Sequence, residues 1–272
     1  MVDKLELIVK GEERYNNQIK ELVSNLVKSE SRIVLLSGPS GSGKTTSAKM
    51  IANELNKYGK KAVYLSMDDW FKTKSEYVVP VREDGQLDFE SPFCVDIDLL
   101  KQNLSDLLNG LEVELPKYDF VNQIMYFDGY SLKIDKNTII VLEGLHALNS
   151  FIDIDRKNVF RVFVKPEDVK VNNTLFTHED IRLYRRISRD SIHRGRTLLE
   201  TLEMLSSVTR GEKLYLNPCV IDIDYYINSY IDYELYLHKS VLGDFEKLEN
   251  LDKMNITVSD IPDNSLLWEF YS

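Results

Sequence analysis

The chain has 272 residues, of which 43% are hydrophobic and 29% charged, a composition typical of a globular protein with a buried core. Its formal net charge of −10 argues against broad nucleic-acid binding, which needs many cations on one face. The sequence has no run of ~18–20 apolar residues, no apolar signal segment, and no metal-ligand spacing at Cys94 and Cys219. We therefore expect a cytoplasmic protein with reduced cysteines that binds neither nucleic acid nor a membrane.

Helical and extended patterns alternate along the chain. An apolar stripe predicts an amphipathic helix over residues 12–29, and short apolar runs predict buried strands over 33–36, 62–65, 138–142 and 159–164. Further helices are expected over 45–58, 96–109, 179–206 (in two pieces broken at Gly195) and 230–250, with a late strand that begins at 220–223. This alternation predicts an α/β fold with a mainly parallel five-stranded sheet flanked by helices.

The stretch 112–134 has a different pattern. Residues 112–115 alternate between polar and apolar side chains, and residues 123–134 resemble a hairpin around Asp128-Gly129. We expect a small β-hairpin flap on the sheet here, and not a second full domain.

A phosphate-binding loop is predicted at residues 38–45. Its sequence, Gly-Pro-Ser-Gly-Ser-Gly-Lys-Thr, meets the pattern G-x-x-x-x-G-K-S/T between a predicted strand and a predicted helix. The glycines let backbone N–H groups turn toward a phosphate, and the helix presents its positive end to the same anion. Lys44 can reach the β- and γ-phosphates, and the Thr45 hydroxyl can bind Mg²⁺. The residues expected to bind the nucleotide are Gly38, Ser40, Gly41, Ser42, Gly43, Lys44, Thr45 and Thr46.

Acidic residues follow two of the predicted strands. Asp68 and Asp69 come after the second strand and Glu143 ends the third, and ligands of parallel sheets bind where the carboxyl ends of strands meet. One of the two aspartates could accept a proton from an acceptor hydroxyl, although a helix cap or an Asx-turn is the alternative. Glu143 suits a Mg²⁺ ligand, direct or through water, and a solvated strand end is its alternative.

Half of the twelve arginines lie within residues 182–196. Arg182, Arg186 and Arg189 recur at i, i+4 and i+7 and so share one face of the predicted helix. Guanidinium groups suit phosphate oxygens and stabilise the charge of a transferring phosphoryl group. A solvated, salt-bridged helix is the alternative, but the concentration of cations in an acidic chain favours a functional role.

Taken in order, these segments resemble the uridine kinase and phosphoribulokinase family of P-loop kinases over residues 32 to about 238. Beside the phosphate loop, the resemblance lies in Ser66-Met67-Asp68-Asp69-Trp70-Phe71, Leu87-Asp88-Phe89-Glu90-Ser91-Pro92, Pro116-Lys117-Tyr118-Asp119-Phe120, Val141-Leu142-Glu143-Gly144-Leu145, and the arginine-rich helix with Arg194-Gly195-Arg196. The stretch 143–149 looks closest to uridine kinase-like members. The resemblance implies a P-loop NTPase fold with lid helices and a flap. Its expected parts are a helical extension over 1–30, a kinase domain over 31–240 with a lid at about 179–212, and a C-terminal helix and tail over 241–272.

The family also implies a reaction. It is the Mg²⁺-dependent transfer of the γ-phosphoryl group of ATP, or GTP, to the 5′-hydroxyl of a nucleoside, with uridine or cytidine as leading acceptors. Asp68 would be the general base. The implied site residues are Asp68, Lys44, Arg186 and Arg189 for catalysis, Arg194 and Arg196 for the nucleotide, Phe71, Glu90, Tyr118, Gln123 and Arg186 for the substrate, and Thr45, Asp68 and Glu143 for Mg²⁺.

Two positions depart from the family pattern. Gln123 stands where uridine kinases usually carry a histidine that reads the pyrimidine edge, and Glu90 replaces an aspartate that is one methylene shorter. Another acceptor, a sugar phosphate or a vitamin precursor, is therefore an alternative. A nucleotide-binding regulatory protein with weak kinase activity is a second alternative, in which the N-terminal helix and the apolar tail at 266–271 would dock a partner. A homo-oligomer is also left open.

Overall fold

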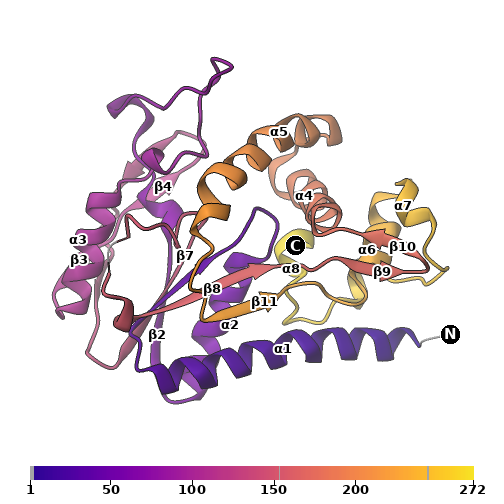
Figure 1. The fold of residues 1–272 in the computed structure, drawn as a ribbon, viewed down its shortest axis with the longest axis horizontal. Coiled ribbons are helices and arrows are strands. Elements are labelled where there is room, and N and C mark those ends of the chain that lie inside the picture. The colour runs from indigo at the N-terminus through magenta and orange to yellow at the C-terminus, as the bar shows by residue number, and fades with distance from the viewer. Residues whose placement is uncertain (1–2, 153, 244) are drawn as a thin grey trace.

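A five-stranded parallel sheet in the order β11-β8-β1-β7-β2 forms the centre of the structure (Figure 1). The structure is a computed structural model that describes residues 3–152, 154–243 and 245–272. The strands are β1 (Ile33–Ser37), β2 (Lys61–Ser66), β7 (Thr138–Glu143), β8 (Val159–Lys165) and β11 (Tyr225–Asn228). The predicted α/β fold with a mainly parallel five-stranded sheet is confirmed.

The middle strand β1 is buried on both faces, as its uninterrupted apolar sequence predicts. Because successive strand residues point to opposite faces, Ile33 and Leu35 pack with α3 (Ile97–Leu108), whereas Val34 and Leu36 pack with α1 (Lys4–Ser29) and α2 (Lys44–Lys57). Helix α1 begins earlier than predicted, because the Asp3 side chain accepts a hydrogen bond from the Glu6 N–H and caps it. Two cores therefore hold the sheet between layers of helices.

Helices α4 (His178–Arg194) and α5 (Leu198–Gly211) form the predicted lid. They separate at Gly195 as expected, where a φ of 59° ends α4 in the left-handed conformation. Helix α5 continues past the predicted end at residue 206 and leads into a π-helical turn, Glu212–Leu216. No helix of the described ranges combines the length and the apolar character that crossing a membrane requires.

The predicted late strand is present as β11, but it begins later than the predicted start at 220–223. Asp222 adopts a left-handed φ of 50°, which interrupts an extended run at this point. Pairing with β8 begins beyond this residue: the N–H of Asp224 donates to the carbonyl oxygen of Arg161 at 2.9 Å, and β11 follows.

The flap exists, but its pairing differs from the prediction. Its strands form two antiparallel pairs, β4 (Lys117–Asp119) with β5 (Ile124–Tyr126) and β3 (Glu112–Glu114) with β6 (Ser131–Lys133). The predicted hairpin around Asp128-Gly129 is therefore wrong: this turn links β5 to β6, and the hairpin turn lies at residues 120–123, where Gln123 takes a φ of 56°. A second small hairpin consists of β9 (Val169–Val171) and β10 (Thr174–Phe176).

The C-terminal part folds back onto the sheet layers. A single helix over 230–250 is wrong, because α6 (Glu234–Leu242) ends at Gly243 with a φ of 67°, and a separate α7 (Glu246–Glu249) follows. Residue 244, on which that prediction also fell, lies outside the described residues. In the tail, which ends in α8 (Trp268–Tyr271), Leu266, Leu267 and Phe270 are buried in the same core as α1. The apolar tail and the apolar face of α1 are thus used within the chain and are not free docking surfaces.

Candidate active site

The phosphate loop joins β1 to α2, as the sequence predicts. At Gly38 a Cβ would lie 2.1 Å from the carbonyl oxygen of Val164, so only glycine fits between the loop and β8. Gly43 caps α2 with a φ of 86°, which favours glycine, and this turn leads into the first helical residue, Lys44. The loop geometry therefore depends on the glycines of the motif.

Polar groups of the loop face one another or nearby elements. The ammonium group of Lys44 donates to the carbonyl oxygen of Pro39 at 3.1 Å and so lies over the loop. The hydroxyl of Ser42 is buried without a hydrogen-bond partner among the described residues. A buried hydroxyl without a partner is costly, and a phosphate oxygen in the loop would supply the missing acceptor. The loop therefore fits a nucleotide phosphate.

Three hydroxyl groups converge on the carboxylate of Glu143 at the end of β7. Its Oε1 atom accepts hydrogen bonds from Thr45, Tyr64 and Ser66, each at 3.1 Å. The side chain is only 4% exposed, and burial together with the negative charge of Asp68 raises the pKa of Glu143 to about 7. A divalent cation offsets such crowded acids and prefers oxygen ligands, so Thr45, Asp68 and Glu143 fit Mg²⁺.

Asp68 lies in a short 3-10 helix, Met67–Trp70, that follows β2. Its side chain is exposed, and the positive charges of Lys44 and Arg194 favour its ionised form. Burial is the main cause that raises the pKa of Asp69. A hydrogen bond with the Tyr118 backbone and the charge of Lys117, both in the flap, act to lower it. Of the two acids, Asp68 is thus the one that interacts with the phosphate loop.

Two lid arginines reach the tip of the phosphate loop. Arg182 donates from Nε to the carbonyl oxygen of Ser40 at 2.9 Å, and Arg186 donates to the Ser40 hydroxyl at 2.7 Å. Glu212, in the turn after α5, accepts from Arg182 at 2.7 Å and from the Ser40 N–H at 3.0 Å. Sequence reasoning missed Glu212, because only the fold brings it to a loop 172 residues away.

The other predicted arginines gather at a buried acid. Arg189, Arg194 and Arg196 lie 3.3, 3.1 and 3.7 Å from the carboxylate of Asp190, which is fully buried. These guanidinium groups come from the end of α4 and from the turn that follows it. Asp190 therefore holds the predicted lid cations together, a role that the sequence did not indicate.

The predicted base-pocket residues lie together between the segment after β2 and the flap. The ring centroids of Phe71 and Tyr118 are 5.5 Å apart, and Phe120 packs edge-on against both at 5.9 and 4.9 Å. Gln123 lies at the turn of the same hairpin, where its carbonyl oxygen accepts the Lys74 N–H at 3.0 Å. The structure thus brings three of the predicted substrate residues close to one another.

Glu90 lies against the end of α5. A Cβ on Gly211 would be 2.4 Å from the Cβ of Glu90, so the two backbones approach closely only because residue 211 is glycine. Burial raises the pKa of Glu90 to about 7, although the charges of Arg186 and Lys44 oppose the shift. The predicted sugar-binding carboxylate is therefore near cations of both the lid and the phosphate loop.

Two buried polar residues beside Glu90 were not among the predicted site residues. Asp88 accepts hydrogen bonds from Arg210 at 2.8 Å and Tyr215 at 2.7 Å, and its other oxygen is unpaired within the described residues. His146 is 5% exposed, and burial lowers its pKa to about 4, so the ring is neutral near pH 7. Asp88 and His146 lie within segments that resemble the family, and this resemblance could have marked them as site residues. A sequence motif does not show, however, that a polar side chain is buried.

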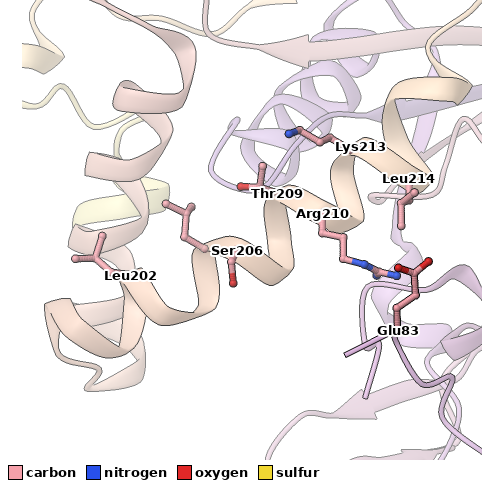
Figure 2. Close-up of a pocket in the computed structure, with 8 residues that line it drawn as sticks. Glu83, Leu202, Ser206, Thr209, Arg210, Lys213 and Leu214 are labelled. Atoms are coloured by element: carbon pink, nitrogen blue, oxygen red, sulfur yellow. The ribbon is translucent and has the colours of Figure 1, made fainter. Parts of the chain in front are cut away.

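Cavities flank the lid on two sides. One of about 520 Å³ is lined by Pro39, Arg182, Arg186 and Glu212 together with other residues of β8, α4 and α5, and so adjoins the phosphate loop. The other, of about 670 Å³, opens between α5 and the loop that carries Glu83 (Figure 2). Its lining, as far as the structure describes it, contains none of the predicted site residues. The second cavity is therefore separate from the predicted acceptor site.

The parallel sheet with its phosphate loop, the acids at the strand ends and the arginine-rich lid define a P-loop kinase, a class that transfers a phosphoryl group to a hydroxyl acceptor. The model of the phosphoribulokinase/uridine kinase family matches residues 33–235. The chain belongs to this family, which confirms the resemblance stated above, and it is an ATP-dependent phosphotransferase with an alcohol acceptor.

Similar proteins support the same assignment. The uridine kinase of Staphylococcus carnosus is 32% identical over 178 residues, 65% of this chain and 77% of its own length. That of Staphylococcus epidermidis is 32% identical over 181 residues, 66% of this chain and 79% of its own length. Among solved structures, a possible uridine kinase from Bacillus stearothermophilus has a TM-score of 0.53 at 16% identity, covering 78% of this chain and 97% of its own. A D-glycerate 3-kinase from Cryptococcus neoformans has a TM-score of 0.51 at 17% identity, covering 74% and 88%. At these identities the solved structures show a shared fold only.

Proposed function

We propose that this chain transfers the γ-phosphoryl group of ATP, or GTP, to the 5′-hydroxyl of a nucleoside, with uridine or cytidine as the leading acceptors, in the cytoplasm. The convergence of Thr45, Glu143 and Asp68 beside Lys44 carries the proposal, because it joins a phosphate site to a metal site and to a candidate base. The relatives named uridine kinase support the acceptor class. We assign the reaction to residues 31–240, with a lid at about 179–212.

On the donor side, the loop amides and Lys44 hold the triphosphate. Mg²⁺, held by Thr45, Asp68 and Glu143, would neutralise charge on the β- and γ-phosphates. Arg186 and Arg189 stabilise the charge of the transferring group, and Arg194 and Arg196 extend this positive field from the lid. Catalysis is thus mainly a matter of positioning and of charge stabilisation.

On the acceptor side, Asp68 takes the proton of the 5′-hydroxyl as that oxygen attacks the γ-phosphorus. Phe71 and Tyr118 offer aromatic faces for the base, and the amide of Gln123 can both donate to and accept from its edge. Glu90 accepts hydrogen bonds from the sugar hydroxyls.

One observation favours a different small alcohol, such as a sugar phosphate or a vitamin precursor. Phe120 packs on both Phe71 and Tyr118, so these rings already have apolar partners without a base. The acceptor screen below separates the two acceptor classes.

The test is ADP or GDP release measured over a panel of nucleosides and other small alcohols, with ATP and with GTP, in the presence of Mg²⁺. We expect turnover with a nucleoside, and a 5′-deoxynucleoside should give none because it lacks the attacking oxygen. If no nucleoside reacts while another alcohol does, the nucleoside assignment is wrong and the kinase assignment stands. The Asp68→Asn variant serves as the inactive control.

A further inference from the structure

The C-terminal tail, residues 262–272, packs directly beneath the phosphate loop. Leu266 is fully buried, and its Cδ1 atom lies 2.5 Å from the position that a Cβ on Gly43 would take. The tail therefore touches the turn at which the loop becomes helix α2.

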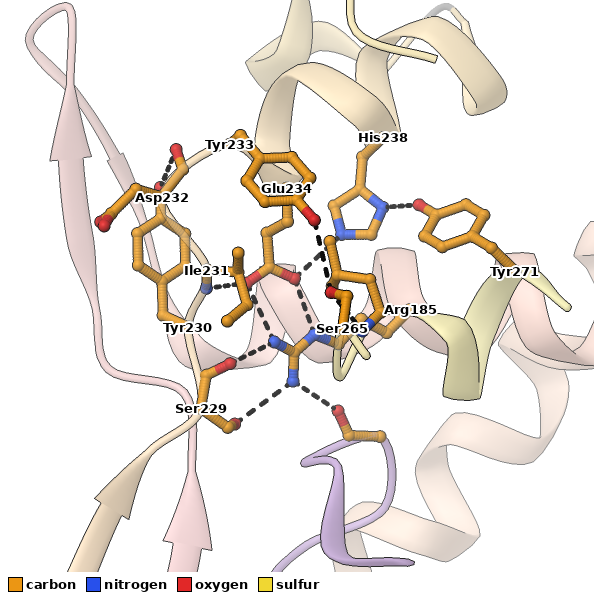
Figure 3. A network of polar contacts seen from close by, with 12 residues as sticks. Arg185, Ser229, Tyr230, Ile231, Asp232, Tyr233, Glu234, His238, Ser265 and Tyr271 are labelled. Atoms are coloured by element: carbon orange, nitrogen blue, oxygen red, sulfur yellow. Dashed lines mark hydrogen bonds and ion pairs between the residues drawn. The ribbon is translucent and has the colours of Figure 1, made fainter. Parts of the chain in front are cut away.

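A buried network fixes the tail in this place (Figure 3). The ring of Phe270 lies 5.0 Å from the guanidinium group of Arg185, which is itself fully buried. Arg185 donates to the carbonyl oxygen of Gly41 in the loop at 3.2 Å, and Tyr271 shares a hydrogen bond with the ring of His238. The tail, the lid helix α4 and the phosphate loop thus belong to one packed unit.

From this position the tail places a carboxylate on the loop. Glu269 accepts a hydrogen bond from the backbone N–H of Thr46 at 2.9 Å. Thr46 is the third residue of α2. The backbone hydrogen bonds of the helix begin only at Ser47, whose N–H donates to the carbonyl oxygen of Gly43 at 3.0 Å. The N–H of Thr46 is therefore one of the first-turn donors without a partner inside the helix, the group that cradles the α- and β-phosphates in this motif.

A second glutamate, Glu212, contacts the other end of the loop, but unlike Glu269 it forms an ion pair. Glu212 accepts from the N–H of Ser40, and its negative charge is paired with Arg182. Glu269 has no cation within ion-pair distance in the part of the chain that the structure describes. Its unpaired charge is repelled by a phosphate at the same N–H, and in a partly buried site that repulsion is stronger than in water.

We propose that Glu269 is an internal competitor for the phosphates of the donor nucleotide and thereby sets the affinity for the donor. One N–H serves one acceptor well, so donor binding requires the carboxylate to leave Thr46. This inference rests on the proposed nucleotide donor and is independent of the acceptor.

Isothermal titration calorimetry with ATP and with inorganic tripolyphosphate, each with Mg²⁺ and without acceptor, tests the proposal on the full chain. Glu269→Gln keeps an acceptor oxygen and removes the charge, whereas Glu269→Ala removes both. We expect the Kd for both ligands to fall about threefold in the Gln variant and about three- to tenfold in the Ala variant. The matched control is Asp263→Asn, which removes one charge from an exposed position of the same tail and should leave both Kd values unchanged.

A Kd that stays the same or rises in the Glu269 variants overturns the proposal, since Glu269 would then only position the loop. Tighter binding of ATP without tighter binding of tripolyphosphate also overturns it, because the effect would lie at the base and not at the phosphates. A thermal melt of each variant without ligand shows whether it is folded. If Glu269→Ala is unfolded, Glu269→Gln alone decides. Failure of the nucleoside screen would leave this result untouched, because no acceptor enters the titration.

Discussion

The buried ion pair of Arg185 and Glu234 allows a quantitative prediction for the substitution Glu234→Gln. Both side chains are 0% exposed, and the guanidinium group forms a fork on the carboxylate with N–O distances of 2.7 and 2.9 Å. Burial works to raise the pKa of Glu234, but the charge and the hydrogen bonds of Arg185 outweigh it and hold that pKa below its ordinary value. The carboxylate is therefore ionised at neutral pH, and its removal leaves a buried cation without a counter-charge.

Breaking a buried pair on one side costs about 3–5 kcal/mol, because the remaining charge stays desolvated. For a chain of this size, that loss corresponds to a fall in Tm of about 10 °C. Urea unfolding at pH 7, followed by far-UV circular dichroism, measures the free energy of unfolding. The control is Lys61→Ala, which breaks the exposed pair with Asp135 at 2.7 Å and should cost less than about 1 kcal/mol.

A loss below about 1 kcal/mol in Glu234→Gln would refute the reasoning. A stricter test is the double variant Arg185→Met with Glu234→Leu, which removes both charges and keeps most of the volume. It should be clearly more stable than Glu234→Gln. If the double variant is no more stable, then losing the hydrogen bonds of Arg185 to Gly41 and Ser229 costs at least as much as leaving its charge unpaired, and the unpaired charge is not the dominant cost.

Three further predictions concern the site. Asp68→Asn should lower kcat at least ~10²-fold, and an unchanged kcat would remove Asp68 from the role of base. Glu90 has its pKa raised from 4.5 to about 7, so the folded chain holds a proton that the unfolded chain releases. The free energy of unfolding should therefore fall as the pH rises from 4.5 to about 7, and the fall should be smaller in Glu90→Gln. Urea unfolding at a series of pH values measures it. Glu143→Gln should raise the Mg²⁺ concentration for half-maximal activity at least ~10-fold in a metal titration, and an equal requirement would argue against metal binding by Glu143.

Local sequence patterns were sufficient to predict the central sheet and the donor loop. Strand β1 is an uninterrupted apolar run, and the glycine motif behind it requires a particular backbone, so burial and local geometry point to the same structure. The start of the late strand was predicted too early because residues 220–223 look as suitable for a strand as β11. Only pairing with β8 and the left-handed Asp222 separate the two.

The contacts that hold the site together could not be predicted in this way. Glu269 and Thr46 are 223 residues apart, and Glu212 and Ser40 are 172 residues apart. The residues around Glu212 and Glu269 in the sequence form no motif. The two carboxylates accept hydrogen bonds from the phosphate loop only because the folded chain brings them next to its N–H groups. Periodicity reports which residues are buried, but not which distant polar groups pair.

The end of α5 lies between Glu90 and the tip of the phosphate loop. A Cβ at position 211 would lie 2.4 Å from the Cβ of Glu90, so Gly211 leaves room for that residue, and the next residue, Glu212, accepts a hydrogen bond from the N–H of Ser40 at the tip of the phosphate loop. A side chain at position 211 would displace either Glu90 or the end of α5. In the second case the carboxylate of Glu212 would also move away from the N–H of Ser40. The positions of Glu90, a proposed sugar ligand, and of the loop tip therefore depend on the same short segment.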